Sequence, residues 1–436
     1  MQIASSWGRT ILFLIAIIAG LQVLHLILLN RLEGRQMKQQ QEPSFSNVES
    51  NPVPIYLVGR HEQEEHPAPV TSIESHFSEL LRMLQRGGVL DTSGQYRVVP
   101  SLAVANSHTS IFPLPDISLV TQCSSHHLRE TIKLASRWQG PISVAIFSEI
   151  HDLGSTLWDI ARLRFCHSSV RQNVSFQLVS PLGAAIHRTP ILPTDAVGHC
   201  NFENGPSGRK NYARTQVPYP VNLLRNVARK AAQTEFVFVV DVDMLPSARL
   251  REMFLAFASR AKLFKESQQD DKTVYVVPTF ELRSGSDVPE SKQQLLTLAE
   301  EGSVRPFYFE LCWKCQMHTD YEAWQKEPPK QNLVPIFEVL WKDPWEPFYI
   351  SRNSAPFYDE RFKQYGFNRI SQVCELHVAG FKYSILDNAF LVHDGFKTAT
   401  SFHEQKDADQ ETNRNLFRQF KTELKDRYPE SSRRCY

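Results

Sequence analysis

The sequence lacks an excess of charge of either sign. Its 436 residues include 48 Lys and Arg against 47 Asp and Glu, which gives a formal net charge of +1. A protein dedicated to nucleic acid needs surplus positive charge to displace the counterions around phosphates. The balance therefore argues against nucleic acid as a partner. With 42% hydrophobic and 22% charged residues, the composition also excludes collagen-like and wholly disordered proteins.

Long hydrophobic runs are scarce as well, with one exception. Residues 11–29 are apolar apart from Gln22 and His25, and as a helix they would span roughly 28 Å, close to the thickness of a bilayer core. A cleaved signal peptide is the rival interpretation, but the run is too long and continues past its small residues. We predict a cytoplasmic tail at 1–10, a transmembrane signal-anchor at 11–29 and a lumenal remainder.

The next segment, residues 30–70, is rich in Gln, Glu, Ser and Pro and lacks apolar periodicity. It is typical of a flexible stem. Order is expected to begin near Thr71, where Thr71-x-x-Glu74 resembles a capping box and precedes a helix that Gly87-Gly88 ends. We therefore expect one lumenal catalytic domain over residues 71–436.

The pattern that follows alternates between strands and helices, which predicts an α/β fold with a mainly parallel sheet. The segment FVFVV at 236–240 has five apolar residues without alternation, and we expect it to form a strand that is buried on both faces. The other expected strands are 117–122, 141–148 and 175–180, and the expected helices include 127–138, 221–232 and 411–428.

The buried strand is followed directly by Asp241-Val242-Asp243. Ligands of open α/β sheets bind at the carboxyl ends of strands, and two carboxylates two residues apart can converge on one divalent cation beside a diphosphate. The alternative is an acidic turn that only ends the strand. A second D-x-D, Asp407-Ala408-Asp409, has no strand before it, and we interpret it as a solvated helix start.

Together these residues resemble a known family. FVFVVDVDMLPS is similar to the nucleotide-sugar site of GT-A glycosyltransferases, where D-x-D binds manganese and the donor diphosphate. Further segments, among them VRPFYFELCWKCQ, DPWEPFYI and FLVHDGFK, resemble the beta-1,4-glucuronyltransferases of the alpha-dystroglycan glycosylation pathway and, less closely, the LARGE-type enzymes. The resemblance covers roughly residues 75 to 436. It implies a GT-A fold, a Rossmann-like mixed sheet flanked by helices.

The resemblance also implies a third metal ligand, His393, and Mn2+ as the ion. A neutral imidazole can complete a site made of two carboxylates. In the same stretch, Gly395 would allow the backbone to approach a phosphate closely, and Lys397 would supply a positive charge to the diphosphate. Arg225 and Asn222 could contact the donor sugar, or they could lie on a solvated helix face.

The implied reaction inverts the anomeric centre and needs one general base. Gly366-Phe367-Asn368-Arg369, where many inverting GT-A enzymes carry a carboxylate, has none. Our first candidate is Glu346, beside the aromatic pair Phe348-Tyr349, whose rings could stack on a sugar. Asp359 and Glu375 follow, and each of the three could instead be an ion-pair partner. Trp341 and Trp345 would join the platform for the acceptor, although core packing is the ordinary role of such residues.

Cysteine is the last scarce type, with seven residues. The odd count leaves at least one thiol unpaired or paired with another chain. Cys312-Trp313-Lys314-Cys315, with His318 nearby, would suggest zinc or redox chemistry in a reducing cytosol. In an oxidising lumen, structural disulfides are favoured, with partners that the sequence leaves open.

The leading hypothesis is a Golgi type II membrane enzyme. It would move glucuronate from UDP-glucuronate to a xylose-ended acceptor on O-mannosyl glycans of alpha-dystroglycan, and its product would prime a LARGE-type enzyme, a plausible physical partner. Two alternatives stay open because a GT-A frame does not fix the donor sugar. One is an N-acetylglucosaminyltransferase that extends poly-N-acetyllactosamine, and the other is an inactive scaffold that binds a partner enzyme or glycan.

Overall fold

The computed structural model describes residues 72–107, 114–182, 200, 217–398 and 406–436, all within one compact unit that runs from Pro67 to Tyr436. The predicted tail, membrane span and stem lie outside these residues. Of the helices that the structure does describe, none combines the length and apolar character needed to cross a bilayer.

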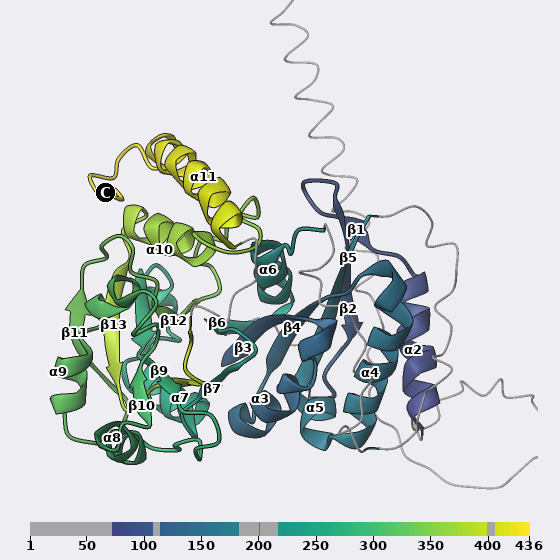
Figure 1. The fold of residues 1–436 in the computed structure, drawn as a ribbon, viewed down its shortest axis with the longest axis horizontal. Coiled ribbons are helices and arrows are strands. Elements are labelled where there is room, and N and C mark those ends of the chain that lie inside the picture. Colours follow the sequence, from purple (N-terminus) through teal and green to yellow (C-terminus); the bar gives the residue numbers. More distant parts are fainter. Residues whose placement is uncertain (1–71, 108–113, 183–199, 201–216, 399–405) are drawn as a thin grey trace, which may run out of the picture. The chain divides into compact units, whose positions relative to one another are not determined.

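The first half of the unit is a run of alternating strands and helices (Figure 1). Strands β3, β4, β5 and β6 are neighbours in the order β5-β4-β3-β6 and are parallel, while β1 and β2 extend the sheet in antiparallel order beside β5. The strands are β1 (Val89–Leu90), β2 (Tyr96–Ala103), β3 (Leu114–Ser124), β4 (Ile142–Phe147), β5 (Val174–Pro181) and β6 (Thr234–Val239). The helices are α2 (Ile73–Gln85), α3 (Glu130–Trp138), α4 (Leu153–Cys166), α5 (Ser168–Asn173) and α6 (Val221–Ala231).

The second half of the chain completes this sheet and adds another. The order continues from β6 as β12-β8-β13-β11, in which only β8 and β13 are parallel, and a separate sheet has the order β10-β9-β14-β7. The strands are β7 (Met244–Pro246), β8 (Thr273–Val277), β9 (Thr279–Leu282), β10 (Val304–Pro306), β11 (Val334–Val339), β12 (Phe348–Arg352), β13 (Lys382–Asp387) and β14 (Leu391–Asp394). The helices are α7 (Leu250–Arg260), α8 (Lys292–Glu300), α9 (Tyr321–Lys326), α10 (Asn368–Val378) and α11 (Lys406–Arg427).

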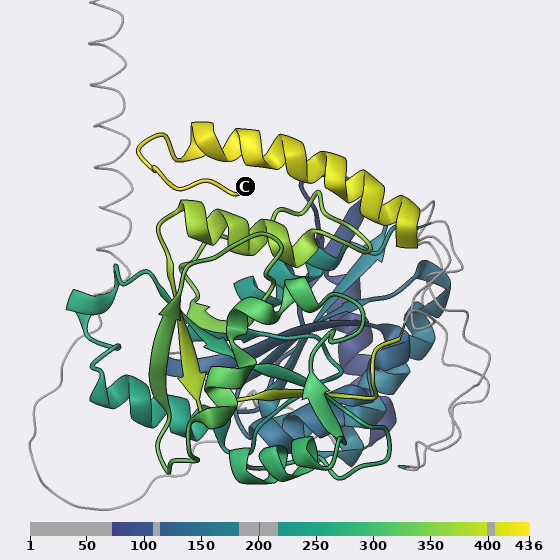
Figure 2. The ribbon, with the colours of Figure 1, turned by 60° about the vertical axis from the view of Figure 1, so that its left-hand side comes forward.

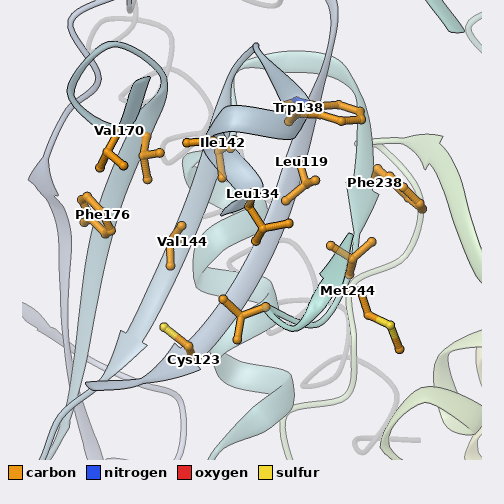
Figure 3. Close-up of a cluster of buried hydrophobic side chains, with 14 of the residues drawn as sticks. Leu119, Cys123, Leu134, Trp138, Ile142, Val144, Val170, Phe176, Phe238 and Met244 are labelled. Atoms are coloured by element: carbon orange, nitrogen blue, oxygen red, sulfur yellow. The ribbon is translucent and has the colours of Figure 1, made fainter. Parts of the chain in front are cut away.

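The parallel strands are buried on both faces, as their apolar sequence predicts. One face, with Leu119, Val144 and Phe238, packs against the helices α2 to α5. Figure 3 shows side chains of α3 and α5, among them Trp138 and Val170, beside this face. The opposite face, with Val120 and Val237, packs against α6. A third cluster lies in the second half of the chain, where α10 and α11 run side by side (Figure 2). The mixed α/β sheet flanked by helices is therefore confirmed. The predicted mainly parallel order is wrong for the large sheet as a whole, in which four pairings are parallel and five antiparallel, because the strands of the second half pair mostly with antiparallel neighbours.

Most expected elements form within a few residues of their predicted bounds, and α11 packs through Phe417, Phe420 and Leu424. The structure corrects the predicted start of α2. Its N-cap is Ser72, whose hydroxyl accepts from the backbone N–H of Ser75, because the helix begins one residue later than a cap at Thr71 requires. Asp407 and Asp409 lie in the first turn of α11, as predicted.

Six cysteines form three disulfides. The pairs are Cys166–Cys200, Cys312–Cys315 and Cys374–Cys435, and the remaining thiol, Cys123, is buried. The C-x-x-C motif is thus closed on itself rather than available for zinc. Both predictions, structural disulfides and one unpaired thiol, are confirmed.

Truncating the central strand should cost stability. Phe238 is fully buried in β6 with its ring 6.3 Å from that of Trp138. We expect Phe238→Ala to lower the free energy of unfolding by about 3–5 kcal/mol, because it removes apolar contacts and leaves a cavity. Urea denaturation measures the change. Leu182→Ala, at a side chain that is 56% exposed, should change it by less than about 0.5 kcal/mol. A loss below about 1 kcal/mol in the first variant would contradict this packing.

Candidate functional site

The two aspartates lie where β6 ends, and each has a different set of partners. Asp241 is held by two guanidinium groups: Arg225 of α6 donates to Oδ1 at 3.2 Å, and Arg369 of α10 donates to Oδ2 at 2.8 Å. Burial alone would raise the pKa of Asp241, but the charges of Arg369 and then Arg225 outweigh it and hold the pKa below its ordinary value. This carboxylate is therefore ionised at neutral pH.

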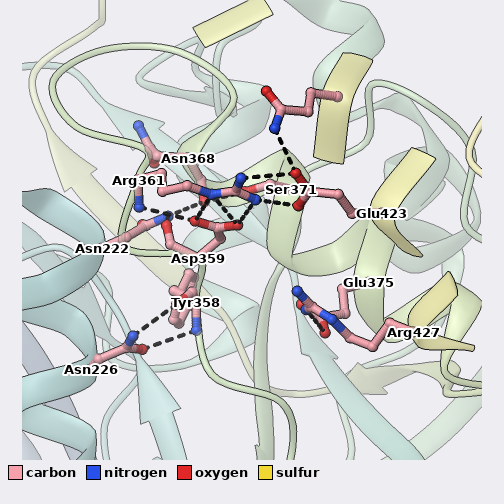
Figure 4. Close-up of polar contacts among 11 residues, drawn as sticks. Asn222, Asn226, Tyr358, Asp359, Arg361, Asn368, Ser371, Glu375, Glu423 and Arg427 are labelled. Carbon is pink, nitrogen blue, oxygen red and sulfur yellow. Dashed lines mark hydrogen bonds and ion pairs between the residues drawn. The ribbon is translucent and has the colours of Figure 1, made fainter. Parts of the chain in front are cut away.

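Two asparagines fix Arg225. Arg225 also donates to the side-chain oxygens of Asn222, at 3.0 Å, and Asn368, at 2.8 Å, and Asn222 in turn donates to the backbone carbonyls of Asp359 and Asn368. Figure 4 shows how these asparagines connect α6 to the start of α10. Asn222 and Arg225 are both buried, so the expected solvated helix face is wrong. The Nη atoms of Arg225 are engaged by Asn222, Asn368 and Asp241, while its Nε has no hydrogen-bond partner among the described residues. A contact of either side chain with the donor sugar stays a prediction.

Asp243 faces the second sheet. In that sheet β14 pairs with β7 in a register that places His393 opposite Met244, so the imidazole arrives beside the aspartate. His393 Nε2 lies 3.1 Å from Asp243 Oδ2, and Lys397 Nζ lies 3.5 Å from the same oxygen. Burial would raise the pKa of Asp243, but the hydrogen bond with His393 and the charge of Lys397 lower it below its ordinary value.

The hydrogen bond of the second ring nitrogen, Nδ1, fixes the tautomer of His393 and so determines what can lie between Nε2 and Asp243. Nδ1 lies 2.7 Å from the carbonyl oxygen of Gly395, so Nδ1 carries a proton and donates it. In a neutral ring, Nε2 then presents a lone pair to a carboxylate oxygen, and a proton or a cation must lie between them. A backbone carbonyl bonded to the second nitrogen is also what metal-binding histidines use to fix their tautomer. The donor set thus fits a divalent ion.

The expected three-ligand cluster is not assembled in full. No group of three His, Cys, Asp or Glu side chains that could hold a metal is found among the described residues, because both oxygens of Asp241 point to arginines while Asp243 meets His393. Gly395 has φ +91°, as a glycine permits, but its N–H donates to the carbonyl of Leu282. Its carbonyl orients His393, and the close approach of its backbone to a phosphate stays a prediction.

Glu346 lies in the same region as Asp241. The structure shows no hydrogen bond or ion pair to its carboxylate from any described residue. Burial raises its pKa to about 7, with the charge of Arg369 opposing the shift and that of Asp241 adding to it. A carboxylate with such a pKa is suited to accept a proton near neutral pH.

The other two candidate bases are engaged elsewhere (Figure 4). Asp359 forms an ion pair with Arg361 at 2.6 Å. Glu375, on α10, is buried and bonds to Arg427 and Tyr428 of the C-terminal segment at 2.6 and 3.0 Å. Both are the ion-pair partners that the sequence left open as the alternative.

The expected aromatic platform is wrong. Trp341, Trp345, Phe348 and Tyr349 are all less than 10% exposed, because β12 lies in the middle of the large sheet and the segment before it packs beneath α10. Phe348 instead lies under Arg369, with the guanidinium carbon 3.8 Å from the ring centroid. The rings therefore support the site from the core.

The sequence did not predict three further residues of the site. They are Arg369, Tyr308 and Tyr365. Burial raises the pKa of both tyrosines, and the charge of Glu346 adds to the shift. Tyr308 has φ +56°, and tyrosine rarely adopts this conformation outside strained functional segments. Tyr308 lies in the family-like segment VRPFYFELCWKCQ, and Arg369 ends Gly366-Phe367-Asn368-Arg369. These segments were the available signal, but the sequence alone did not assign a role to either side chain.

The fold is of the α/β class, and its family defines a sugar-transferring enzyme. The family model described as "Glycosyl-transferase for dystroglycan" matches residues 116–429. The chain belongs to this family.

Two relatives are similar over most of their length. Beta-1,4-glucuronyltransferase 1 of Danio rerio is 37% identical over 444 residues, covering 98% of each chain. The Homo sapiens protein of the same name is 41% identical over 383 residues, covering 85% of this chain and 89% of that one. Among solved structures, GalNAc-T7 with UDP, GalNAc and Mn2+ matches 65% of this chain and 45% of that chain at 10% identity, with a TM-score of 0.35.

Removing Arg369 should show how much its ion pair with Asp241 contributes to the stability of the fold. Because the carboxylate has a lowered pKa, its pairing stabilises the fold above the unfolded pKa of about 3.9 and is lost as the pH falls through the folded value. We expect Arg369→Gln to destabilise the protein by about 1–2 kcal/mol at pH 7, a value reduced for the partial exposure of Asp241. The difference from wild type should narrow below about pH 4.

Denaturation at several pH values measures this difference. Arg249→Gln is the matched control, because its pair with Glu252 is exposed and should contribute close to nothing. A deficit in Arg369→Gln that stays constant with pH would mean that its charge does not act on Asp241.

Proposed function

We propose that the chain transfers glucuronate from UDP-glucuronate to a xylose-ended acceptor on O-mannosyl glycan of alpha-dystroglycan and forms a beta-1,4 linkage. The observation that carries this proposal is the 37% and 41% identity, over most of each chain, to two proteins named beta-1,4-glucuronyltransferase 1. Membership of the dystroglycan glycosyltransferase family supports this acceptor. The product would prime elongation by a LARGE-type enzyme.

Asp243 and His393 would hold Mn2+, with Asp241 oriented beside them by its two arginines. The ion, when bound, would offset the negative charge that develops on the departing diphosphate. Lys397, 3.5 Å from Asp243 Oδ2, adds a positive charge on the same side. Arg225 acts as a positioning residue, because its contacts to Asn222, Asn368 and Asp241 leave it buried.

Glu346 is the proposed base. Its carboxylate takes the proton of the acceptor hydroxyl as the hydroxyl oxygen attacks the anomeric carbon of glucuronate. The bond from that carbon to the UDP oxygen breaks, and UDP leaves with the electron pair. Because attack and departure occur on opposite faces, an alpha-linked donor gives a beta-linked product.

The proposed location is the Golgi, with residues 11–29 as a single-pass anchor and the catalytic domain in the lumen. Three disulfides among the described residues support an oxidising compartment, because the cytosol keeps thiols reduced.

A substitution at Asp243 tests the ion site. We expect Asp243→Asn to lower Mn2+-dependent transfer from UDP-glucuronate at least a hundredfold and to abolish the rise in Tm on adding Mn2+, since binding to the folded state raises stability. Asp407→Asn, in the second D-x-D at the start of α11, is the matched control and should behave as wild type. An unchanged Mn2+ effect on the Tm of Asp243→Asn would defeat the assignment of this ligand.

Two glutamates with opposite expected behaviour test the base. Glu346→Gln should lower kcat by roughly 10²–10⁴ while the protein stays folded. Glu375→Gln should lower stability by about 1–3 kcal/mol, because a buried hydrogen-bonded pair is broken, and leave kcat within about twofold. In wild type, activity should rise with pH through about 7, because Glu346 must be ionised to accept a proton.

Rates across a pH series, together with Tm values, provide the readout. The assignment of Glu346 as the base would be wrong if Glu346→Gln kept the wild-type rate. It would also be wrong if Glu375→Gln lost activity while it kept full stability. A donor panel with UDP-glucuronate and UDP-N-acetylglucosamine tests the proposed sugar in the same assay.

A further inference from the structure

The loop after β10 carries three exposed apolar side chains. Phe309 is 50% exposed, Trp313 40% and Met317 42%. Only ten large hydrophobic side chains are exposed in the part of the chain that the structure describes, and three of them fall within this short stretch. Such a local concentration indicates a binding surface, whereas scattered exposed residues do not.

The two aromatic rings are arranged against each other. The ring centroids of Phe309 and Trp313 are 5.6 Å apart with an interplanar angle of 72°. On its inner side Trp313 contacts the buried Tyr321, with centroids 6.1 Å apart. Each ring therefore has a supported side and a side open to solvent.

Both ends of this loop reach the candidate site. At one end, the ring of Phe307 lies 6.1 Å from that of His393 and stacks on Tyr308 at 4.2 Å. At the other end, the carbonyl of Cys315 accepts from the backbone N–H of Glu346 at 2.9 Å. The exposed rings thus lie on the segment that links the proposed ion ligand to the proposed base.

The loop is held in one conformation. The Cys312–Cys315 disulfide closes its turn, and the N–H of Tyr308 donates to the buried carboxylate of Glu281 at 2.9 Å. The carbonyl of Glu346 accepts from Gln316 at 3.3 Å. A preorganised aromatic surface loses little conformational entropy when a ligand binds.

We propose that Phe309 and Trp313 form the acceptor subsite, a platform on which a sugar ring of the acceptor glycan stacks while its terminal hydroxyl reaches Glu346. The C–H groups on one face of a sugar ring are apolar and weakly positive, and they pack on the negative face of an aromatic ring. The one acidic residue between Tyr308 and Trp313, Glu310, is paired with Arg305 at 2.5 Å. The proposed contact is between apolar ring faces and needs no charge on the sugar.

This inference rests on the proposed function. It assigns acceptor binding to exposed rings, because the aromatic side chains at 341–349 are buried and cannot contact a sugar. The loop that carries these rings is bonded to the segment of the base, where the backbone N–H of Glu346 donates to the carbonyl of Cys315. A change in the platform should therefore affect the acceptor and spare the donor.

The test uses the full chain in detergent, with xylobiose as acceptor and UDP-glucuronate as donor. The double variant Phe309→Ala/Trp313→Ala should raise the KM for xylobiose at least tenfold, with kcat within about twofold. The KM for UDP-glucuronate and the rate of UDP release without acceptor should stay at wild-type values. Phe309→Tyr and Trp313→Phe, which keep the aromatic faces, should retain a KM for xylobiose within about threefold.

Leu340→Ala, at an apolar side chain that is 62% exposed, is the matched control and should match wild type. An unchanged KM for xylobiose in the double variant overturns the platform. So does an equal loss in acceptor-free UDP release, which would show that the loop only supports the fold. A rise in KM for glycosylated alpha-dystroglycan but not for xylobiose would instead mark a protein contact and also overturn it. Failure of the proposed function is distinct, because wild type itself would then release no UDP from UDP-glucuronate.

Discussion

Two buried cations that meet one carboxylate hold the site together. Arg225 and Arg369 come from helices far apart in the chain, and a buried guanidinium is tolerated only when an opposite charge and hydrogen-bond acceptors surround it. Asp241 supplies that charge at the end of β6. The first half of the chain, with its parallel strands, is thereby coupled to the start of α10 in the second half. The positions of Asn222 and Asn368, which bond to Arg225, follow from this junction.

The second sheet is the other determinant of the site. Its strand β14 pairs with β7 on one side and β9 on the other, and this register brings His393 to Asp243 although 150 residues separate them. The chain that leaves the same sheet through β10 continues into the loop with Tyr308 and the exposed rings. One small sheet therefore positions the imidazole, one wall of the site and the proposed acceptor surface.

The contrast between buried and exposed aromatics shows how function is distributed in this segment. The rings at 341–349 fill the core and support Arg369, while Phe309 and Trp313 lie on a loop closed by a disulfide. Glu346 lies between the two groups. The core rings support the residues next to the base, as Phe348 does for Arg369. The exposed rings lie on a separate loop that a disulfide closes.

Local sequence determined the strands and helices, the carboxylate pair at the end of a buried strand, the pairing state of the cysteines and the resemblance that the family match confirms. These follow from near-neighbour patterns, since burial on two faces needs a continuous apolar strand and helix faces need a repeat of 3.6 residues. Tertiary structure alone decided that Arg225 turns inward to Asp241, that Arg369 and Tyr308 join the site, that Glu375 belongs to an ion pair and that the tryptophans are core. Such contacts join residues 16 to 128 positions apart, and no local pattern records which distant surface will cover a given side chain.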